Sequence, residues 1–245
     1  MAYYIEKIVL EGQIDINSYL NGLPAVKYLK ENELNLAADV VFFVGENGTG
    51  KSTLLEAIAV SLGFNPEGGT RNFSFSTKDT HSSLSSLIRT GKKKNPRDGF
   101  FLRAESFYNV ATNIDRMDEE PSFGPPIVNS YGGISLHEQS HGESFLALVQ
   151  NRFGGNGLYL LDEPEAALSP MRQIALLGEI NNLVKRNSQF VIATHSPILM
   201  AYPGAKIIEF SEKGLREVFY KDTEHYVITK SFLDEPGRYF RYLFD

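Results

Sequence analysis

Residues 40–58 read VVFFVGENGTGKSTLLEAI, and this stretch decides the fold. The five apolar residues 40–44 predict a buried strand, and the apolar residues after position 53 recur at helical spacing. Between these two segments, Gly45 is followed after four residues by Gly50-Lys51-Ser52, which is the spacing of a phosphate-binding loop. The stretch therefore has the strand–loop–helix context that this motif requires.

Each part of this loop has a physical task. Glycine tolerates positive φ and has no Cβ, so consecutive backbone N–H groups can converge on phosphate oxygens. The unpaired N–H groups of the first helical turn and the helix dipole favour the same anion. Lys51 is predicted to neutralise the β and γ phosphates of a nucleoside triphosphate, and Ser52 to offer its hydroxyl to Mg²⁺. The alternative is a glycine-rich turn that binds no ligand.

The overall composition is that of an ordinary soluble protein, with 42% hydrophobic and 22% charged residues in a chain of 245. A net charge of −6 gives no whole-chain basic field that would attract nucleic acid or anionic lipid. The sequence contains no apolar run long enough to cross a membrane, and its first residues lack the pattern of an export signal. Without cysteines it has no disulfide frame, and we expect a cytoplasmic protein with no integral membrane segment.

The rest of the chain alternates predicted strands with predicted helices, which indicates an α/β fold with a mainly parallel central sheet. Residues 5–16 alternate apolar and polar residues and predict an N-terminal antiparallel β part that is broken at Gly12. We expect a single domain over residues 1–245 with a small inserted lobe at about 106–139. The further strands are expected at 99–104, 158–161, 190–193, 206–210 and 215–220, and the helices at 143–153, 169–186 and in the C-terminal tail.

Two carboxylates follow the predicted strand at residues 158–161. Asp162 would stand at the carboxyl end of that strand, where it can hold a Mg²⁺ ion that also binds Ser52. Glu163 comes next and is placed to polarise the water that attacks the γ-phosphoryl group. The alternative for this pair is an acidic turn that only begins a helix.

A second candidate phosphate site lies at residues 139–143, which read QSHGE at the start of a predicted helix. Ser140 and Glu143 have the spacing of a capping box, which is a sufficient structural reason for both. Gly142, however, removes a side chain where the helix N-terminus would meet an anion. Both explanations therefore remain open for this segment.

His195 follows the predicted strand at residues 190–193. A histidine at that position can hydrogen-bond the γ-phosphate or the attacking water. A lone histidine is more often structural, but this one comes 33 residues after Asp162, across one helix and one strand. We therefore expect it to lie beside the same pocket.

Together these motifs resemble those of the ATP-binding-cassette (ABC) ATPases, in particular the stand-alone soluble kind related to the SMC and RecF-like branch. The resemblance runs from Ile5 to about Phe210. It implies that ATP and Mg²⁺ bind, with Asp162 at the metal, Glu163 and Lys51 in catalysis and His195 as the switch histidine. It also implies an ATP-dependent head-to-tail homodimer. The implied nucleotide contacts are Gly45, Asn47, Gly48, Thr49, Gly50, Lys51, Ser52 and Thr53 of one copy and Ser140 and Gly142 of the other.

The sequence departs from the family pattern at two positions. The signature Leu-Ser-Gly-Gly-Gln is here Gln-Ser-His-Gly-Glu, so His141 replaces a glycine. Glu105 stands about where the family has a glutamine, and it would have to reach the metal through water. Glu105 is nevertheless the third candidate metal ligand, after Ser52 and Asp162.

The leading hypothesis is an ATP hydrolase whose dimerisation around two nucleotides drives another process. A nucleotide-gated binding module with negligible hydrolysis, the ATPase subunit of a transporter with a separate membrane partner, and a small-molecule kinase are the alternatives. Five basic side chains in residues 89–97 leave a DNA or protein partner possible, although such a run is usually a solvated hairpin tip or loop.

Overall fold

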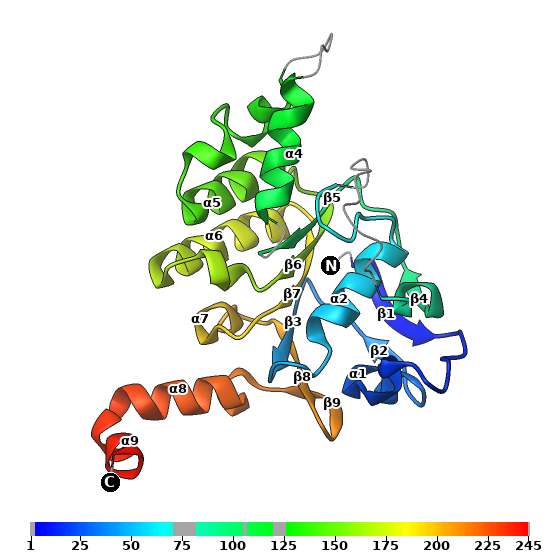
Figure 1. Ribbon diagram of the computed structural model, residues 1–245, viewed down its shortest axis with the longest axis vertical. Helices are drawn as coiled ribbons and strands as arrows, with labels where there is room; N and C mark the ends of the chain where they lie inside the picture. The colour runs from blue at the N-terminus through cyan, green and yellow to red at the C-terminus, as the bar shows by residue number, and fades with distance from the viewer. Residues whose placement is uncertain (1–2, 71–81, 105–106, 120–125, 245) are drawn as a thin grey trace.

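A computed structural model of the protein describes residues 3–70, 82–104, 107–119 and 126–244. It has two sheets, of six and three strands, with helices packed around the larger one (Figure 1). Together with the mainly parallel pairing in the larger sheet, this confirms the expected α/β class.

The six-stranded sheet has the order β5-β6-β7-β3-β8-β9. Adjacent strands run parallel from β5 to β8, and only β9 is antiparallel to its neighbour. The carboxyl ends of β6, β7 and β3 therefore lie side by side at one edge of the sheet. The strand bounds are β3 (Val40–Gly45), β5 (Asp98–Arg103), β6 (Gly157–Asp162), β7 (Gln189–Ala193), β8 (Lys206–Ser211) and β9 (Gly214–Val218).

The side chains of the central strands alternate between two hydrophobic clusters, one on each face of the sheet. In β3, Val41 and Phe43 pack with α2 (Lys51–Ser61). Phe42 and Val44 pack on the other face with α5 (His141–Arg152) and α6 (Pro170–Lys185). Burial on both faces explains the continuous apolar runs in these strands. It also places α2 and α5 on opposite faces of the sheet.

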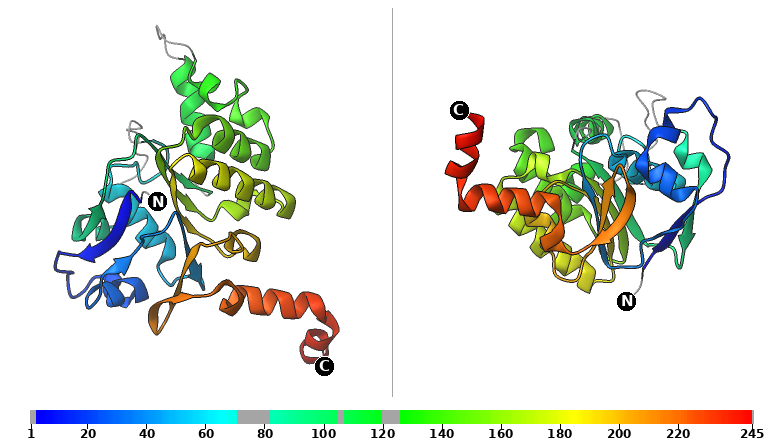
Figure 2. Two further views of the ribbon diagram at one scale, coloured as in Figure 1. Left: turned by 180° about the vertical axis from the view of Figure 1, so that it is seen from behind. Right: turned by 90° about the horizontal axis from the view of Figure 1, so that it is seen from below.

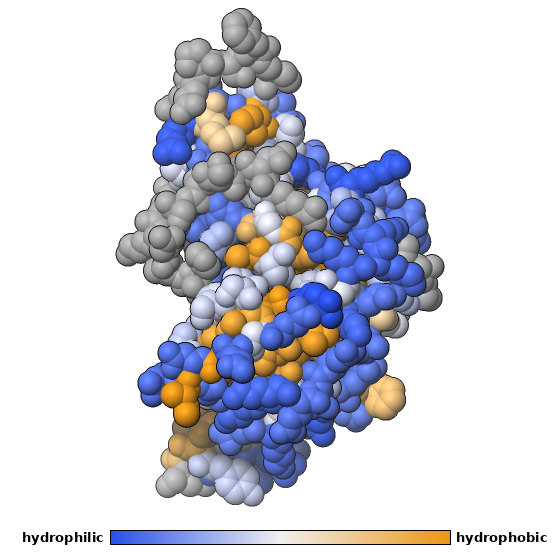
Figure 3. All heavy atoms as spheres, turned by 90° about the vertical axis from the view of Figure 1, so that its right-hand side faces the viewer, coloured by the Kyte–Doolittle hydropathy of each residue, from blue (hydrophilic) through white to orange (hydrophobic). Residues whose placement is uncertain are grey.

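The smaller sheet is antiparallel, in the order β2-β1-β4, and it meets the solvent on the side shown in Figure 3, where hydrophilic residues surround an apolar area. Gln189 of β7 joins it to the central sheet. The Gln189 carboxamide accepts the N–H groups of Tyr4 and Ile5 at 2.8 Å and donates to three backbone carbonyls, among them Leu36. The bounds are β1 (Ile5–Leu10), β2 (Leu34–Asn35) and β4 (Ile88–Lys92).

The basic run at 89–97 does not form a loop along its whole length. Its first four residues belong to β4, which pairs with β1. Arg89 forms an ion pair with Glu11, and Lys94 lies over the ring of Tyr4, so the run has contacts within the chain. The strand expected at 5–16 also ends early, at Leu10, because the next residues turn toward Leu87 and bond to its carbonyl.

The C-terminal helices α8 (Glu224–Asp234) and α9 (Pro236–Leu243) extend away from the sheet as an arm (Figures 1 and 2). No helix in the described part of the chain is long and apolar enough to cross a membrane. In the region of the expected lobe, α4 and the 3₁₀ helices η2 and η3 pack into the hydrophobic cluster that contains Phe42 and Val44. That this region forms a separate lobe stays a prediction. The remaining elements are α1 (Pro24–Leu29), α3 (Leu84–Leu87), α4 (Phe107–Glu119), α7 (Pro197–Met200), η1 (Tyr19–Gly22), η2 (Ile127–Tyr131), η3 (Leu136–Glu138), η4 (Pro164–Ala167) and η5 (Tyr220–Asp222).

Asp98, at the start of β5, makes a buried polar network that we expect to set the acid stability of the fold. Burial by itself would raise the pKa of Asp98, but hydrogen bonds from the Gly154 N–H and the Tyr159 hydroxyl, with the charge of Arg152, lower it overall. The network therefore stabilises the protein above the unfolded pKa of about 3.9, and the contribution disappears as the pH falls through the folded pKa.

The Asp98→Asn variant should lose about 1–3 kcal/mol of unfolding free energy at pH 7. Urea denaturation of wild type and variant at pH 7 and pH 3 measures this difference. We expect the difference to be smaller at pH 3, and an equal difference at both values would contradict the charge argument.

Candidate functional site

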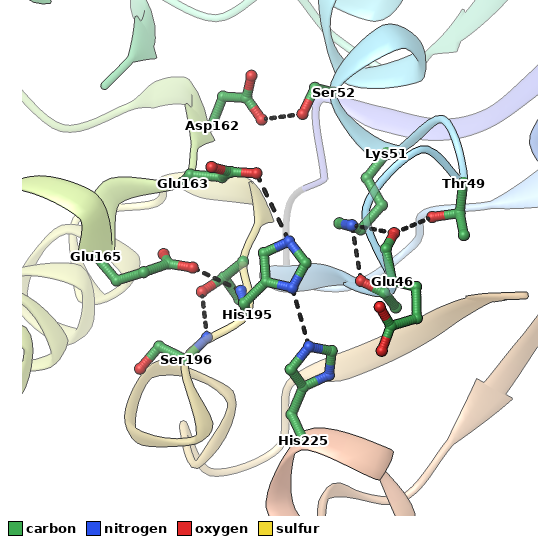
Figure 4. A network of polar contacts seen from close by, with 12 residues as sticks. Glu46, Thr49, Lys51, Ser52, Asp162, Glu163, Glu165, His195, Ser196 and His225 are labelled. Carbon is green, nitrogen blue, oxygen red and sulfur yellow. Dashed lines mark hydrogen bonds and ion pairs between the residues drawn. The ribbon is translucent and has the colours of Figure 1, made fainter. Parts of the chain in front are cut away.

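Three adjacent strands deliver the candidate residues to one place. The loop after β3, Asp162 at the end of β6 and His195 just beyond β7 meet at the carboxyl edge of the central sheet (Figure 4). Open α/β sheets bind ligands at this edge. Residues more than a hundred positions apart thereby form one group.

The loop has the backbone of an anion cradle. Gly45, Gly48 and Gly50 have φ values of 128°, 79° and 94°, which side chains other than glycine rarely adopt. A Cβ at Gly45 would lie 2.1 Å from the Phe210 carbonyl oxygen, whereas one at Gly48 would meet nothing within 4 Å. The loop is thus anchored against β8 at its start and open at its tip. This geometry fits a bound phosphate chain.

Lys51 is held inside the loop that it follows. Its Nζ donates to the carbonyl oxygens of Gly45 at 2.7 Å and Glu46 at 2.8 Å, and the residue is 4% exposed. Burial lowers the pKa of Lys51, and the carboxylates of Glu163 and Asp162 oppose this shift. Both of these hydrogen bonds go to backbone carbonyl oxygens and not to a carboxylate. The ammonium group is therefore placed at the loop, which suits a role toward phosphate oxygens.

Ser52 and Asp162 lie in direct contact. The Ser52 hydroxyl donates to Asp162 Oδ1 at 2.8 Å, across 110 positions of sequence (Figure 4). A hydroxyl and a carboxylate beside a phosphate cradle are the protein ligands that Mg²⁺ takes in this type of site, with phosphate oxygens and water in the other positions. The donor set therefore fits magnesium, and these two oxygens would hold the ion.

Glu163 has an unusual backbone conformation. Its φ is 49°, in the left-handed region that non-glycine residues occupy only when the surroundings impose it. Here the Glu163 N–H donates to the Ala193 carbonyl of β7 at 2.9 Å, and a proline follows the residue. The carboxylate lies 3.6 Å from His195 Nε2. Such backbone strain is typical of functional positions.

His195 is fixed through both its backbone and its ring. Its N–H donates to Glu165 Oε1 at 2.5 Å, and its Nδ1 lies 2.9 Å from Nε2 of His225 (Figure 4). Burial, followed by the positive charge of Lys51, lowers the pKa of His195. The imidazole is therefore neutral at pH 7.

The structure does not bring every predicted residue to this group. Ser140 and Gly142 lie at the start of α5, on the face opposite α2, where Ser140 and Arg172 bond to the Glu143 carboxylate. The capping-box geometry is present there. A Cβ at Gly142 would meet Arg172 Nη1 at 2.5 Å, so tight packing also explains this glycine. Glu105 lies outside the described residues.

Two residues at the site were missed in the sequence. Arg103 ends β5 in register with Asp162 and lies 3.5 Å from its Oδ2, while it bonds to Glu56 of α2 at 2.6 Å. The sequence pattern that could have identified Arg103 is the same as for Asp162, namely a charged residue at the end of an apolar strand. His225 had no signal, because it lies 30 positions beyond His195 in an exposed helical tail.

Comparison with known proteins agrees with this geometry. A family model described as an AAA domain matches residues 19–114, which contain the loop. A second AAA-domain model, whose description names a putative AbiEii toxin of a type IV TA system, matches residues 129–201, which contain Ser140, Gly142, Asp162, Glu163 and His195. An uncharacterized ABC transporter ATP-binding protein of Haemophilus influenzae is 34% identical over 73 residues. That match spans 29% of this chain and 28% of the relative.

Solved structures of similar fold superpose on nearly the whole chain. CbiO1 from Clostridium perfringens, part of the ABC transporter complex CbiONQ, superposes with a TM-score of 0.53 and 18% identity, over 96% of this chain and 97% of that one. A nucleotide-free ATP-binding cassette from an ABC transporter superposes with a TM-score of 0.51 and 16% identity, over the same shares. The chain has the ATP-binding-cassette fold.

This fold accounts for the distribution of the candidate residues. The loop, Asp162 and His195 share the edge of the sheet at which α/β nucleotide-binding folds place their ligand. The segment at 139–143 belongs to helices on the other side of the sheet. Within one chain the two groups are therefore separate.

Proposed function

We propose that this ATPase hydrolyses ATP to ADP and phosphate with Mg²⁺ and that two copies dimerise head to tail around two nucleotides. The observation that carries the proposal is the contact of Ser52 with Asp162 and of Glu163 with His195 beside the loop. A metal-holding pair and an acid–histidine pair then flank one phosphate cradle. A small-molecule kinase has no evident use for the second pair.

Each residue has a role that follows from its position. The loop N–H groups and Lys51 would bind and orient the triphosphate. Mg²⁺ held by Ser52 and Asp162 would neutralise charge on the phosphate oxygens. Glu163 would accept a proton from the attacking water at its carboxylate, and the neutral His195 would donate a hydrogen bond from Nε2 toward the γ-phosphate.

Dimerisation is inferred from the separation of the two groups. Ser140 is exposed at a helix N-terminus, which favours an anion, yet it lies on the face opposite α2. A second copy could bring that N-terminus to the loop of the first. A head-to-tail pair with two-fold symmetry closes both sites at once.

The process that the dimer drives is left open. The relative from Haemophilus influenzae bears the name of a transporter subunit, which keeps a separate membrane partner possible. The basic run at 89–97 favours DNA less than its composition suggested, because Arg89, Lys93 and Lys94 already contact Glu11, Glu6 and Tyr4. A gated module that binds nucleotide with negligible hydrolysis, cytoplasmic location and membership of the SMC and RecF-like branch stay predictions.

Sedimentation of the wild type with and without ATP and Mg²⁺ tests the proposal, with phosphate release measured on the same samples. The Lys51→Ala variant is the control, because it removes the ammonium group at the cradle while the other loop residues remain. We expect ATP to raise the sedimentation coefficient of the wild type only and phosphate release to fall at least about 100-fold in the variant. Wild-type release equal to that of Lys51→Ala would favour the gated module.

A further inference from the structure

His225 is the first side chain of the C-terminal arm to reach the ATPase site. It lies in the first turn of α8, and its Nε2 is 2.9 Å from His195 Nδ1. The two rings meet edge to face, with centroids 5.0 Å apart and an interplanar angle of 60° (Figure 4). This is a direct hydrogen bond between the switch histidine and an element outside the central sheet.

The direction of this hydrogen bond determines what His195 offers to the site. A neutral imidazole carries one N–H, and the partner of one nitrogen fixes the proton on the other. If His195 Nδ1 carried the proton, its Nε2 lone pair would face the Glu163 carboxylate at 3.6 Å, which is repulsive. If His225 donates instead, His195 carries the proton on Nε2 and points it toward Glu163. The second arrangement is the favourable one.

His195 Nε2 has a further property that points to a ligand. The atom is buried, and it has no hydrogen-bond partner within the described ranges of the chain. A buried N–H without a partner is costly in a folded protein. An incoming phosphate oxygen or water would satisfy it, which gives a reason to maintain the Nε2–H tautomer.

We propose that His225 is a positioning residue that holds His195 in the Nε2–H tautomer and in the orientation facing Glu163. Glu165 fixes the backbone of the same histidine, so the ring and the main chain of His195 are anchored separately. This inference rests on the proposed function, because the γ-phosphate is the group that the held N–H would meet.

The contact also ties the arm to the site. Tyr226, next to His225, packs on Tyr220 with ring centroids 4.7 Å apart. Residues of α7, α8 and the site together line a cavity of about 570 Å³. Displacement of α8 would release the ring of His195.

Two substitutions separate the hydrogen bond from the bulk of the side chain. His225→Leu removes the donor, and His225→Gln keeps an N–H that can reach Nδ1. Val227→Ala, a change two positions further along α8 at a residue that is 51% exposed, controls for general effects on the arm. We expect kcat to fall about tenfold in His225→Leu, as when an outer partner of a functional histidine is removed. ATP affinity should be unchanged, and His225→Gln should recover most of the loss.

Nitrogen-15 NMR of the histidine side chains reads the tautomer directly in the nucleotide-free protein, with His195→Gln used to assign the signal. The wild type and His225→Gln should show the Nε2–H form of His195, and His225→Leu a mixture of both forms. An unchanged His195 tautomer in His225→Leu would overturn the proposal, as would equal kcat values for the Leu and Gln variants. A wild type without ATPase activity would refute the proposed function instead, while the tautomer would still test the positioning.

Discussion

Replacing Glu163 by glutamine should lower kcat for ATP hydrolysis by about 10²–10⁴-fold, the usual contribution of a general base. The amide keeps the size of the side chain but cannot accept the proton of the attacking water. The Glu163 backbone at φ 49° is held by the bond of its N–H to the Ala193 carbonyl, which does not depend on the carboxylate. ATP should therefore still bind.

The same variant should accumulate as an ATP-bound dimer, because hydrolysis is the step that reopens it. Sedimentation with ATP and Mg²⁺ measures the dimer, and phosphate release measures turnover. Glu179→Gln is the matched control, since this carboxylate lies on α6 and bonds to Gln150 away from the site. A Glu163→Gln protein that remains monomeric with ATP would exclude the nucleotide-sandwiched dimer.

The second large effect is complementation between two inactive variants. Lys51→Ala disables the loop, and Ser140→Asp puts a carboxylate where the γ-phosphate of the other copy would lie. Aspartate remains a good N-cap residue, so α5 should keep its start. Each variant alone should lose at least about 100-fold of its activity. An equal mixture should recover up to about a quarter of wild-type activity, because half of the dimers are mixed and each has one intact site.

This recovery depends on the two groups acting across the dimer. If Ser140 and the loop worked within one chain, every chain in the mixture would carry one broken part, and activity would stay at the level of the separate variants. Mixing Lys51→Ala with Glu163→Gln provides the control. These two residues belong to the same side of the interface, so one site of each mixed dimer lacks Lys51 and the other lacks Glu163. Neither site is intact, and no recovery is expected.

Much of the fold was predictable because its local signals agree. Strands buried on both faces must be apolar throughout, and the runs at 40–44, 158–161 and 190–193 correspond to β3, β6 and β7. The basic run at 89–97 did not reveal the strand β4, because a high density of charge indicates solvent exposure and not backbone conformation. Arg89 and Lys92 are exposed in β4, as side chains on a strand at the edge of a small sheet can be.

By itself, the sequence determined the phosphate loop and the Asp162–Glu163 pair. Both features depend only on residues that are adjacent in the chain: a glycine-rich loop after a strand, and carboxylates at the end of a strand. Only the tertiary structure decided which distant residues meet them. Arg103 reaches Asp162 because β5 and β6 pair in register, and Gln189 joins the two sheets by bonds across more than 150 positions. His225 reaches His195 because β8 and β9 fold back and return the chain to the site. Contacts of this kind depend on strand order and packing, which no local pattern encodes.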